Sequence, residues 1–308
     1  MNKRVNTGVS MKVLVTGGSG FLGSHVADAL SDAGHEVTIF DAVASPWLRA
    51  DQAMILGDLL DRDGLAKAVQ GMDAVYHFAG IADIEDCAKS PMTTASVNIL
   101  GTVGLLDCCV AAQVGRFVFA SSAYVFSEAG SFYRTSKRAC ESFIEDYAKR
   151  YGLKYTCLRY GSLYGPRADQ RNSIHSLLRQ AVETGAITYH GNGDELREFI
   201  HVFDAARSSV EILAPEFENQ NVILTGVEKM TYRELLEMIR EIFGGRVELN
   251  ILPSDRAAHY RITPYSFAPK LGRKLVSNLF VDFGQGLLHC IDALHGEQVA
   301  RQQREDGE

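Results

Sequence analysis

Short apolar segments alternate with longer amphipathic segments through the first half of the chain. Residues 11–17 (MKVLVTG) form a short apolar run rich in β-branched residues, and such a run predicts a buried strand. In residues 21–30 the apolar side chains recur at helical spacing. Further strands are predicted at 36–41, 53–58, 73–80, 115–122 and 154–160, and further helices at 61–69, 93–112 and 133–152. Strands separated by helices predict βαβ units and a parallel sheet.

The second half of the chain is less regular. Helices are predicted at 173–185, 203–213, 231–244 and 283–296, a short strand at 221–226, and two extended segments joined by a turn within 187–202. The turn is predicted at Asn192–Gly193, a pair that favours tight turns. We therefore expect an α/β fold in which a doubly wound parallel sheet carries a smaller C-terminal α/β region at its edge.

Composition places the chain among soluble globular proteins. It has 308 residues, enough for one large or two modest domains, with 46% hydrophobic and 22% charged residues. The net charge of −7 gives no overall field for non-specific binding to nucleic acids or anionic membranes. No apolar run reaches the roughly 18–20 residues that cross a bilayer. We expect a cytoplasmic protein without nucleic-acid or membrane partners.

The cysteines and the chain ends suggest no special chemistry. Six cysteines, at positions 87, 108, 109, 140, 157 and 290, show no C-x-x-C spacing. A chain of this size needs no disulfides, so we expect reduced thiols in the core and no metal site. Residues 1–10 and 300–308 are polar, and we expect them to be flexible.

A glycine cluster follows the first predicted strand and precedes the first predicted helix. Gly18, Gly20 and Gly23 fit the G-x-G-x-x-G fingerprint of dinucleotide-binding turns, and Gly17, Gly20 and Gly23 fit a looser G-x-x-G-x-x-G pattern. Glycines permit a tight turn and a close approach of the backbone to a pyrophosphate, while the helix N-terminus presents N–H groups to the anion. A plain turn is the alternative, but the position between strand and helix favours a Rossmann-type dinucleotide site.

Residues at the ends of the next strands indicate which dinucleotide binds. Asp41 ends the second predicted strand, where a carboxylate accepts hydrogen bonds from ribose hydroxyls and repels a 2′-phosphate. No Arg or Lys follows before Arg49, so NAD is favoured over NADP. Asp58 either touches the adenine or caps a helix. Small residues follow His77, as a backbone close to a cofactor requires, and His77 itself is interpreted as a packed or capping residue.

A second set of residues carries the candidate chemistry. The fifth predicted strand ends at Ser122, at the edge of the sheet where ligands bind. Tyr133 and Lys137 follow, and their i, i+4 spacing places them on one helix face. A phenol with a pKa of about 10 is a poor base at neutral pH, but a nearby ammonium favours the phenolate. Together these groups predict a proton relay beside a hydride acceptor.

The order of these motifs resembles that of the extended short-chain dehydrogenases/reductases of the nucleotide-sugar epimerase/dehydratase type. The motifs are TGGSGFLG, Asp41, GDL, HFAG, VNILGTVGLL, FASSAYVF, Tyr133/Lys137, LRYGSLYGPR and GNGDELREFIHV. The resemblance implies a Rossmann domain that binds NAD, a smaller domain that binds a nucleotide-diphosphate sugar, and a homodimer formed through a helix bundle. In domain terms, residues 11–166 with returning segments at about 198–226 would bind NAD, and 167–197 with 227–300 would bind substrate.

The resemblance also implies roles for individual residues. Ser122, Tyr133 and Lys137 resemble the catalytic trio, and they would also contact the substrate (Ser122, Tyr133) or the cofactor (Tyr133, Lys137). The remaining cofactor-binding residues would be Gly17, Gly20, Phe21, Leu22, Gly23, Asp41, Asp58, Leu59, Phe78, Ala79, Gly80 and Asn98. Arg197 resembles an arginine that clamps the substrate pyrophosphate, a contact for which bidentate arginine is suited. Asn172 and Arg256 are further candidates for the substrate phosphates.

Three departures from the family pattern stand out. The segment between Ser122 and Tyr133 is much shorter than the some 25 residues usual in the family, so we expect a wider pocket or a different placement of the serine. Ser162 stands where the family has an Asn expected to touch the substrate. GPRADQRN, at 165–172, lacks the commonest continuation.

The residues after Ser122 indicate which reaction of the family to expect. The 4,6-dehydratases carry Thr-Asp-Glu where this chain has Ser122-Ala123-Tyr124, and the decarboxylases often carry a Glu there. Ser-Ser-Ala followed by an aromatic residue and Val most resembles the 4-epimerases. We therefore predict an NAD-dependent epimerase that works through a transient 4-keto sugar. The alternatives are a net sugar-nucleotide oxidoreductase such as a 4-ketoreductase, a dehydratase, and a non-catalytic NAD-binding sensor, which an intact Tyr133 and Lys137 disfavour.

Overall fold

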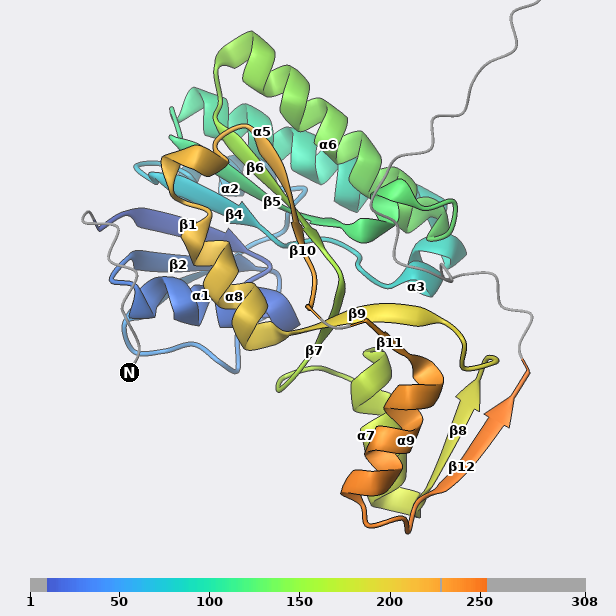
Figure 1. The fold of residues 1–308 in the computed structure, drawn as a ribbon. Helices are drawn as coiled ribbons and strands as arrows, with labels where there is room; N and C mark the ends of the chain where they lie inside the picture. The colour runs from blue at the N-terminus through green and yellow to red at the C-terminus, as the bar shows by residue number, and fades with distance from the viewer. Residues whose placement is uncertain (1–9, 228, 254–308) are drawn as a thin grey trace, which may run out of the picture. The chain divides into compact units, whose positions relative to one another are not determined.

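The computed structural model describes residues 10–227 and 229–253, all of which lie in one compact unit, Met1–Ala268. A seven-stranded sheet is the largest feature of this part of the chain (Figure 1). Its strands are β1 (Lys12–Thr16), β2 (Glu36–Asp41), β3 (Gln52–Leu56), β4 (Ala74–His77), β5 (Arg116–Ser122), β6 (Tyr155–Tyr160) and β10 (Gln220–Leu224). The predicted helix at 283–296 and the predicted flexible ends, 1–10 and 300–308, lie outside the described residues apart from position 10.

All seven strands run parallel, in the order β3-β2-β1-β4-β5-β6-β10. Val13 of β1 pairs with Val37 on one side and with Ala74 on the other. The strand order therefore reverses between β1 and β4, and such a switch point opens a crevice at the carboxyl ends of the strands.

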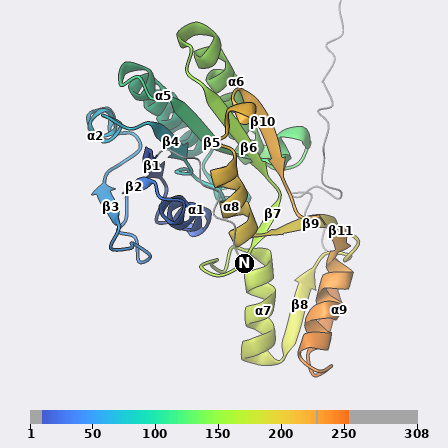
Figure 2. The same ribbon diagram turned by 60° about the vertical axis from the view of Figure 1, so that its left-hand side comes forward.

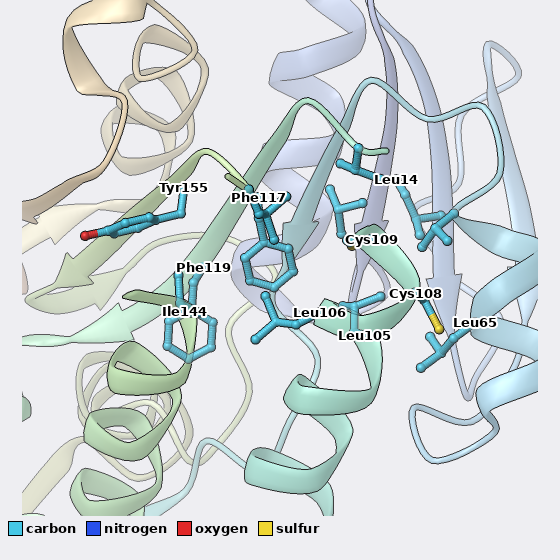
Figure 3. Close-up of a cluster of buried hydrophobic side chains, with 14 of the residues drawn as sticks. Leu14, Leu65, Leu105, Leu106, Cys108, Cys109, Phe117, Phe119, Ile144 and Tyr155 are labelled. Carbon is cyan, nitrogen blue, oxygen red and sulfur yellow. The ribbon is translucent and has the colours of Figure 1, made fainter. Parts of the chain in front are cut away.

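Helices cover both faces of the sheet, as Figures 1 and 2 show. The helices that pack on this sheet are α1 (Phe21–Asp32), α2 (Arg62–Ala68), α5 (Gly101–Ala111), α6 (Ser131–Tyr151) and α8 (Val202–Glu211). On one face α1 and α8 bury Val26 and Ala205 against Val13 and Val118. On the other face α2, α5 and α6 cover a second cluster of buried side chains, drawn in Figure 3. The prediction of a doubly wound Rossmann-type sheet is confirmed.

The second cluster explains why the strands of the sheet are continuous apolar runs in the sequence. Phe117 and Phe119 point from β5 toward Leu105 and Leu106 of α5 and Ile144 of α6 (Figure 3). A parallel strand covered on both faces must be apolar on both sides. The five cysteines among the described residues are buried and form no disulfide bonds. They serve as small hydrophobic residues of the core.

The helix predicted over 93–112 is present, with a local irregularity. The chain is helical from Pro91 to Ala111 through α4 (Pro91–Thr94), a π-helical turn η1 (Ala95–Leu100) and α5, and the short helix α3 (Ile84–Lys89), which was not predicted, precedes it. The expectation that no apolar run is long enough to span a bilayer was wrong, because the continuous stretch Pro91–Ala111 is 21 residues long and sufficiently apolar. Half of it is buried within the protein, where α5 packs on the sheet, as is typical of a core helix.

The remaining described elements are two short 3₁₀ turns, η2 and η3, and two small sheets with their helices. The elements are η2 (Ala123–Phe126), β7 (Ser162–Tyr164), α7 (Ser173–Thr184), β8 (Ala186–His190), β9 (Leu196–His201), η3 (Pro215–Phe217), β11 (Lys229–Thr231), α9 (Tyr232–Ile242) and β12 (Glu248–Leu252). The two extended segments predicted within 187–202 are β8 and β9, but they do not pair with each other. β8 pairs with β12, whereas β9 lies between β7 and β11. Helices α7 and α9 enclose a third hydrophobic cluster beside β8 (Figure 1).

Candidate active site

A pocket of about 1220 Å³ lies at the carboxyl ends of the central strands. Most of the predicted site residues line it: Gly17, Gly20, Phe21, Leu22, Gly23, Asp41, Asp58, Leu59, Phe78, Ala79, Gly80, Ser122, Tyr133, Lys137 and Asn172. The glycine turn and the Tyr/Lys pair come from segments more than a hundred residues apart in the sequence, and the fold brings them to one pocket.

The glycine turn is shaped by close backbone contacts. Gly17 has a φ of +75°, and a Cβ there would lie 2.4 Å from the backbone N of Ala79. A Cβ on Gly23 would lie 2.2 Å from the carbonyl oxygen of Gly17. At Gly20 only that same oxygen comes within 4 Å of a Cβ, at 3.3 Å. Two glycines are thus required for packing, and the third leaves the backbone open toward the pocket.

The first turn of α1 presents backbone donors at the same place. Gly20 is the N-cap residue and supplies no side chain to cap the helix. The N–H groups of Phe21 and Leu22, which also line the pocket, therefore keep their hydrogen-bonding capacity for an anion. This combination of open backbone and helix N-terminus fits a dinucleotide pyrophosphate.

The two predicted acids lie farther along the pocket. Asp41 ends β2, and its carboxylate accepts hydrogen bonds from the backbone N of Ser19 (3.0 Å) and of Val43 (3.2 Å). These contacts fix the carboxylate while leaving acceptor capacity for ribose hydroxyls. Asp58 accepts a bond from the backbone N of Leu60 at 2.9 Å, so it holds its own turn as well as lining the pocket.

Lys137 is buried beneath the chemical end of the pocket. Its Nζ donates a 2.7 Å hydrogen bond to the carbonyl oxygen of Ala120 on β5. The same nitrogen lies 4.8 Å from the centre of the Phe119 ring and 5.9 Å from the centre of the Tyr133 ring. Burial lowers the pKa of Lys137, because removal from water disfavours the ammonium. The lysine is therefore a fixed group whose charge acts in a largely water-free environment.

The short segment between Ser122 and Tyr133 folds compactly. Ser122 ends β5 and its Oγ accepts a hydrogen bond from the backbone N of Tyr124 at 3.3 Å. The Tyr124 ring meets the Tyr133 ring edge to face, with 6.2 Å between the ring centres. Gly130, with a φ of +92°, is the N-cap of α6 and turns the chain into the helix that carries Tyr133. The shortened segment thus still delivers both residues to the pocket.

Asn98 lies behind the pocket wall rather than in it. Within the π-helical turn its side chain accepts from the backbone N of Ile81 (2.7 Å) and donates to the carbonyl oxygen of Ile81 (2.9 Å). It also donates to Ser136 Oγ at 3.0 Å, on the helix that carries Tyr133 and Lys137. This geometry fits a residue that positions the helix, and it leaves the predicted cofactor contact without support from the pocket lining.

Of the residues predicted to bind the substrate phosphates, one lines the pocket and one does not. Asn172 lines the pocket and caps α7, accepting from the backbone N of His175 and donating to the carbonyl oxygen of Leu163. Arg197 is buried on β9, where its guanidinium lies 5.6 Å from the centre of the Tyr232 ring, and it does not line this pocket. Arg256 lies outside the described residues. Their roles toward phosphate stay predictions.

His77 is a buried structural residue, as its sequence context indicates. Its Nδ1 lies 2.7 Å from Thr16 Oγ1 and its Nε2 lies 2.9 Å from Thr102 Oγ1. Burial, together with the nearby Lys137 charge, lowers the pKa of His77 to about 3. The imidazole is therefore neutral, and it ties β1, β4 and α5 together below the crevice.

Arg167 is a pocket residue that the sequence reasoning did not single out. It lines the pocket, forms a 2.7 Å ion pair with Asp28 and stacks over Trp47 at 4.8 Å. Its Nη1 is buried and has no hydrogen-bond partner among the described residues. The signal was present, since Arg167 ends the LRYGSLYGPR motif that carries part of the family resemblance.

Comparisons with known proteins agree with this geometry. The sequence matches the NAD dependent epimerase/dehydratase family over residues 13–224. A putative UDP-glucose 4-epimerase of Methanocaldococcus jannaschii is 27% identical over 257 residues, covering 77% of this chain and 84% of that protein. The structure of a UDP-glucose 4-epimerase with UDP-glucose from Thermotoga maritima is similar with a TM-score of 0.76 and 26% identity, covering 83% of this chain and 90% of that one.

A second solved structure connects the fold to a cofactor. The Thermus thermophilus UDP-glucose 4-epimerase in complex with NAD is 28% identical with a TM-score of 0.75, and the match covers 85% of this chain and 95% of that one. Relatives of comparable identity also include a UDP-glucuronic acid decarboxylase and a dTDP-glucose 4,6-dehydratase. The chain belongs to the NAD-dependent epimerase/dehydratase family, as its motifs predicted.

Proposed function

We propose that this protein is an NAD-dependent enzyme that inverts carbon 4 of a nucleotide-diphosphate sugar such as a UDP-hexose. One observation carries the proposal: Ser122, Tyr133 and Lys137 line the same pocket as the glycine turn. The 4-epimerases among its relatives support the same function. An NAD-binding sensor would have no use for a phenol set beside a buried ammonium.

The residues that would hold NAD are those of the crevice at the switch point. Backbone donors of Phe21 and Leu22 at the start of α1 would bind the pyrophosphate, and Asp41 would bind the adenosine ribose. Lys137 would contact the nicotinamide ribose. When bound, NAD supplies reversible hydride acceptance and return at the sugar carbon.

The chain's own residues supply the proton chemistry. Tyr133, as phenolate, takes the proton of the sugar C4 hydroxyl and later returns it to the C4 oxygen, while Ser122 hydrogen-bonds the same oxygen. The configuration at carbon 4 inverts because the hydride would return to the opposite face of that carbon. The Lys137 ammonium favours the phenolate, because an opposite charge in a dry site lowers the pKa of an acid. The 4-keto sugar must turn between the two steps, and the short 123–132 segment is compatible with the room this requires.

The residues next to Ser122 favour epimerisation over elimination. Elimination of water requires an added acid and base, whereas the two positions after Ser122 hold a buried Ala123 and the aromatic Tyr124. Neither position supplies the carboxyl groups, Asp and Glu, that the 4,6-dehydratases carry there. A 4-ketoreductase would use the same catalytic groups but would consume NADH or NADPH. Measuring the net consumption of cofactor therefore distinguishes a reductase from an epimerase.

The proposal extends to substrate recognition, assembly and location. We propose that 167–197 and 227–300 bind the nucleotide, with Asn172 at the pocket and Arg197 and Arg256 toward the phosphates. Phe132, Phe143 and Tyr151 on α6 expose 42–53% of their surface, which fits a homodimer formed through this helix. We also propose a cytoplasmic location, where nucleotide sugars are made.

A screen of sugar nucleotides tests the proposal. Purified protein, checked for co-purified dinucleotide, is incubated with UDP-glucose, UDP-galactose, UDP-N-acetylglucosamine and UDP-glucuronic acid, and products are resolved by chromatography and proton NMR. A mixture of 4-epimers without added NADH supports the proposal. Stoichiometric consumption of NADH or NADPH would identify a reductase, and a 4-keto-6-deoxy product or released CO₂ would identify the other branches of the family.

A further inference from the structure

A buried ion pair joins the three elements that surround the chemical end of the pocket. Arg159 of β6 donates to Glu141 of α6 through Nε (2.9 Å to Oε1) and Nη2 (2.7 Å to Oε2). Ser121 of β5 donates from Oγ to the same Oε1 at 2.5 Å. The Glu141 and Arg159 side chains are 8% and 14% exposed. The carboxylate thus accepts three hydrogen bonds from two strands (the elements are labelled in Figure 1).

Each anchor of this network lies close in sequence to a residue of the proposed site. Ser121 directly precedes Ser122, and Glu141 lies one helical turn beyond Lys137 and two beyond Tyr133. Arg159 directly precedes Tyr160, which lines the pocket, as does Gly161. The Arg159 guanidinium also lies over the Phe126 ring, 4.4 Å from the ring centre, so Arg159 covers the η2 turn that follows Ser122.

We propose that Glu141 is a positioning residue, which together with Arg159 and Ser121 sets the register of α6 against β5 and thereby places Tyr133 and Lys137 relative to Ser122. The inference rests on the proposed function, because it assigns those three residues their roles. Neither Glu141 nor Arg159 lines the pocket, so they act through other residues rather than on the substrate.

The chemistry of the pair suits positioning better than stability. Removing two charges from water offsets much of their attraction, so a buried ion pair adds little net stability over an apolar pair of the same volume. The geometry of the pair is strongly directional. The bidentate Arg159–Glu141 contact, with Ser121 as a third donor, allows only one relative placement of the helix and the two strands. The hydrogen bond from Lys137 Nζ to the carbonyl oxygen of Ala120 joins α6 to β5 at one point, and the contact of Glu141 with Ser121 joins them at a second point one helical turn further on.

The matched control lies on β5, at the opposite end of that strand from Ser121. Arg116 begins β5, is 6% exposed in its side chain, and forms a 2.9 Å ion pair with Glu218 and a 2.9 Å hydrogen bond to Thr156 Oγ1. It is remote from the pocket lining. Arg116→Lys and Arg159→Lys therefore make the same chemical change at two buried arginines of one sheet, and only Arg159 adjoins the proposed site.

The test compares Glu141→Gln, Arg159→Lys and Arg116→Lys with the wild type in the full chain. A cavity of about 130 Å³ lined by Arg138, Glu145 and the pair itself gives water access to an unpaired charge, which helps the variants fold. We expect Glu141→Gln and Arg159→Lys to lower kcat on the order of 10²-fold with KM close to wild type, because small displacements of reacting groups cost that much. Arg116→Lys should keep the wild-type kcat.

Ser121→Ala provides a second variant that removes no charge. Ser121 also lines the pocket, so the loss of kcat in Ser121→Ala alone would not show whether the residue acts through Glu141. The double variant with Glu141→Gln is therefore compared with both single variants in a double-mutant cycle. If Ser121 acts through Glu141, the losses in kcat are less than multiplicative. Multiplicative losses would mean that Ser121 acts on substrate independently of the network, against the proposal.

Amide hydrogen exchange separates this inference from the proposed function. Exchange at 123–137 should rise in Glu141→Gln and Arg159→Lys but not in Arg116→Lys. Unchanged exchange, or a kcat per folded molecule equal to wild type in both network variants, would overturn the inference. If the wild type epimerises no sugar nucleotide, the proposed function fails, and the exchange result still decides whether Glu141 sets the placement of α6.

Discussion

The Nζ of Lys137 lies 5.9 Å from the centre of the Tyr133 ring while donating a 2.7 Å hydrogen bond to the carbonyl oxygen of Ala120. The charge is thus held to the sheet, one helical turn from the phenol, and does not depend on a bound ligand for its position. A prearranged charge costs no reorganisation during the reaction, which is the condition for effective electrostatic catalysis.

Replacing the phenol tests its role as the proton carrier. Tyr133→Phe is expected to lower kcat by roughly 10²–10⁴-fold, the usual contribution of a positioned acid or base, while dinucleotide binding is retained. Tyr151→Phe is the matched control, since Tyr151 ends the same helix and is 53% exposed. Turnover and bound dinucleotide are measured on the same samples. A Tyr133→Phe enzyme with wild-type turnover would exclude the phenol as base.

The pH dependence of turnover tests the charge of Lys137. Burial lowers the pKa of this lysine, so its ammonium is lost as pH rises through a value below the ordinary one of about 10.4. We expect kcat to fall at alkaline pH through that lowered pKa, because the uncharged amine no longer favours the phenolate. Lys137→Met should abolish most turnover at every pH. A kcat that stays constant to pH values above about 10.4 in folded protein would contradict this role.

Comparing alanine variants of two glycines with similar φ angles distinguishes backbone strain from steric crowding at the cofactor turn. Gly17 and Gly71 have φ values of +75° and +70°, but a Cβ would meet Ala79 only at Gly17 and nothing within 4 Å at Gly71. Both alanine variants bear the left-handed strain of roughly 1–2 kcal/mol. Gly17→Ala should also weaken NAD binding by about tenfold or more, where each 1.4 kcal/mol is tenfold. Isothermal titration with NAD on both variants checks this, and equal affinities would refute it.

The buried His77 makes a defined contribution to acid sensitivity. Its pKa is about 3 in the folded protein and about 6.5 when unfolded, so the unfolded chain binds one more proton between these values. The free energy of unfolding should therefore decrease as pH falls below about 6.5, with His77 contributing up to roughly 1.4 kcal/mol per pH unit.

The matching variant is His77→Gln, which keeps a donor and an acceptor. Urea unfolding at pH 7.5, 6.5, 5.5 and 5.0 should show a weaker loss of stability in His77→Gln than in wild type. Parallel curves for the two proteins would mean that His77 takes up a proton in the folded state, contrary to its burial between Thr16 and Thr102.

Much of the fold follows from local patterns in the first half of the chain. Strands such as Lys12–Thr16 are buried on both faces and therefore appear as apolar runs, and the turn at Gly17 is imposed by backbone crowding that only glycine permits. In the second half the partners of a strand are distant in sequence. Nothing local to β8 shows that it pairs with β12 rather than with β9. The segments of β8 and β9 could therefore be predicted but not their pairing, and β12 itself was not predicted.

The site was predictable to the same extent. Tyr133 and Lys137 are adjacent on a helix, so spacing alone places them together. Arg197 carries the expected residue type, yet its position beside Tyr232 depends on the packing of β9 against α9. The network of Ser121, Glu141 and Arg159 was not predicted, because it joins three elements whose residues show no motif in common.

Isotopic labelling of the sugar tests the central claim most directly. A UDP-hexose deuterated at carbon 4 is incubated with purified protein in ordinary water without added dinucleotide, and the 4-epimer is analysed by NMR and mass spectrometry. We predict that the product keeps its deuterium at carbon 4, since the hydrogen that leaves that carbon is held in the pocket and returned to it. Loss of deuterium to solvent, or the absence of any 4-epimer, would contradict the account.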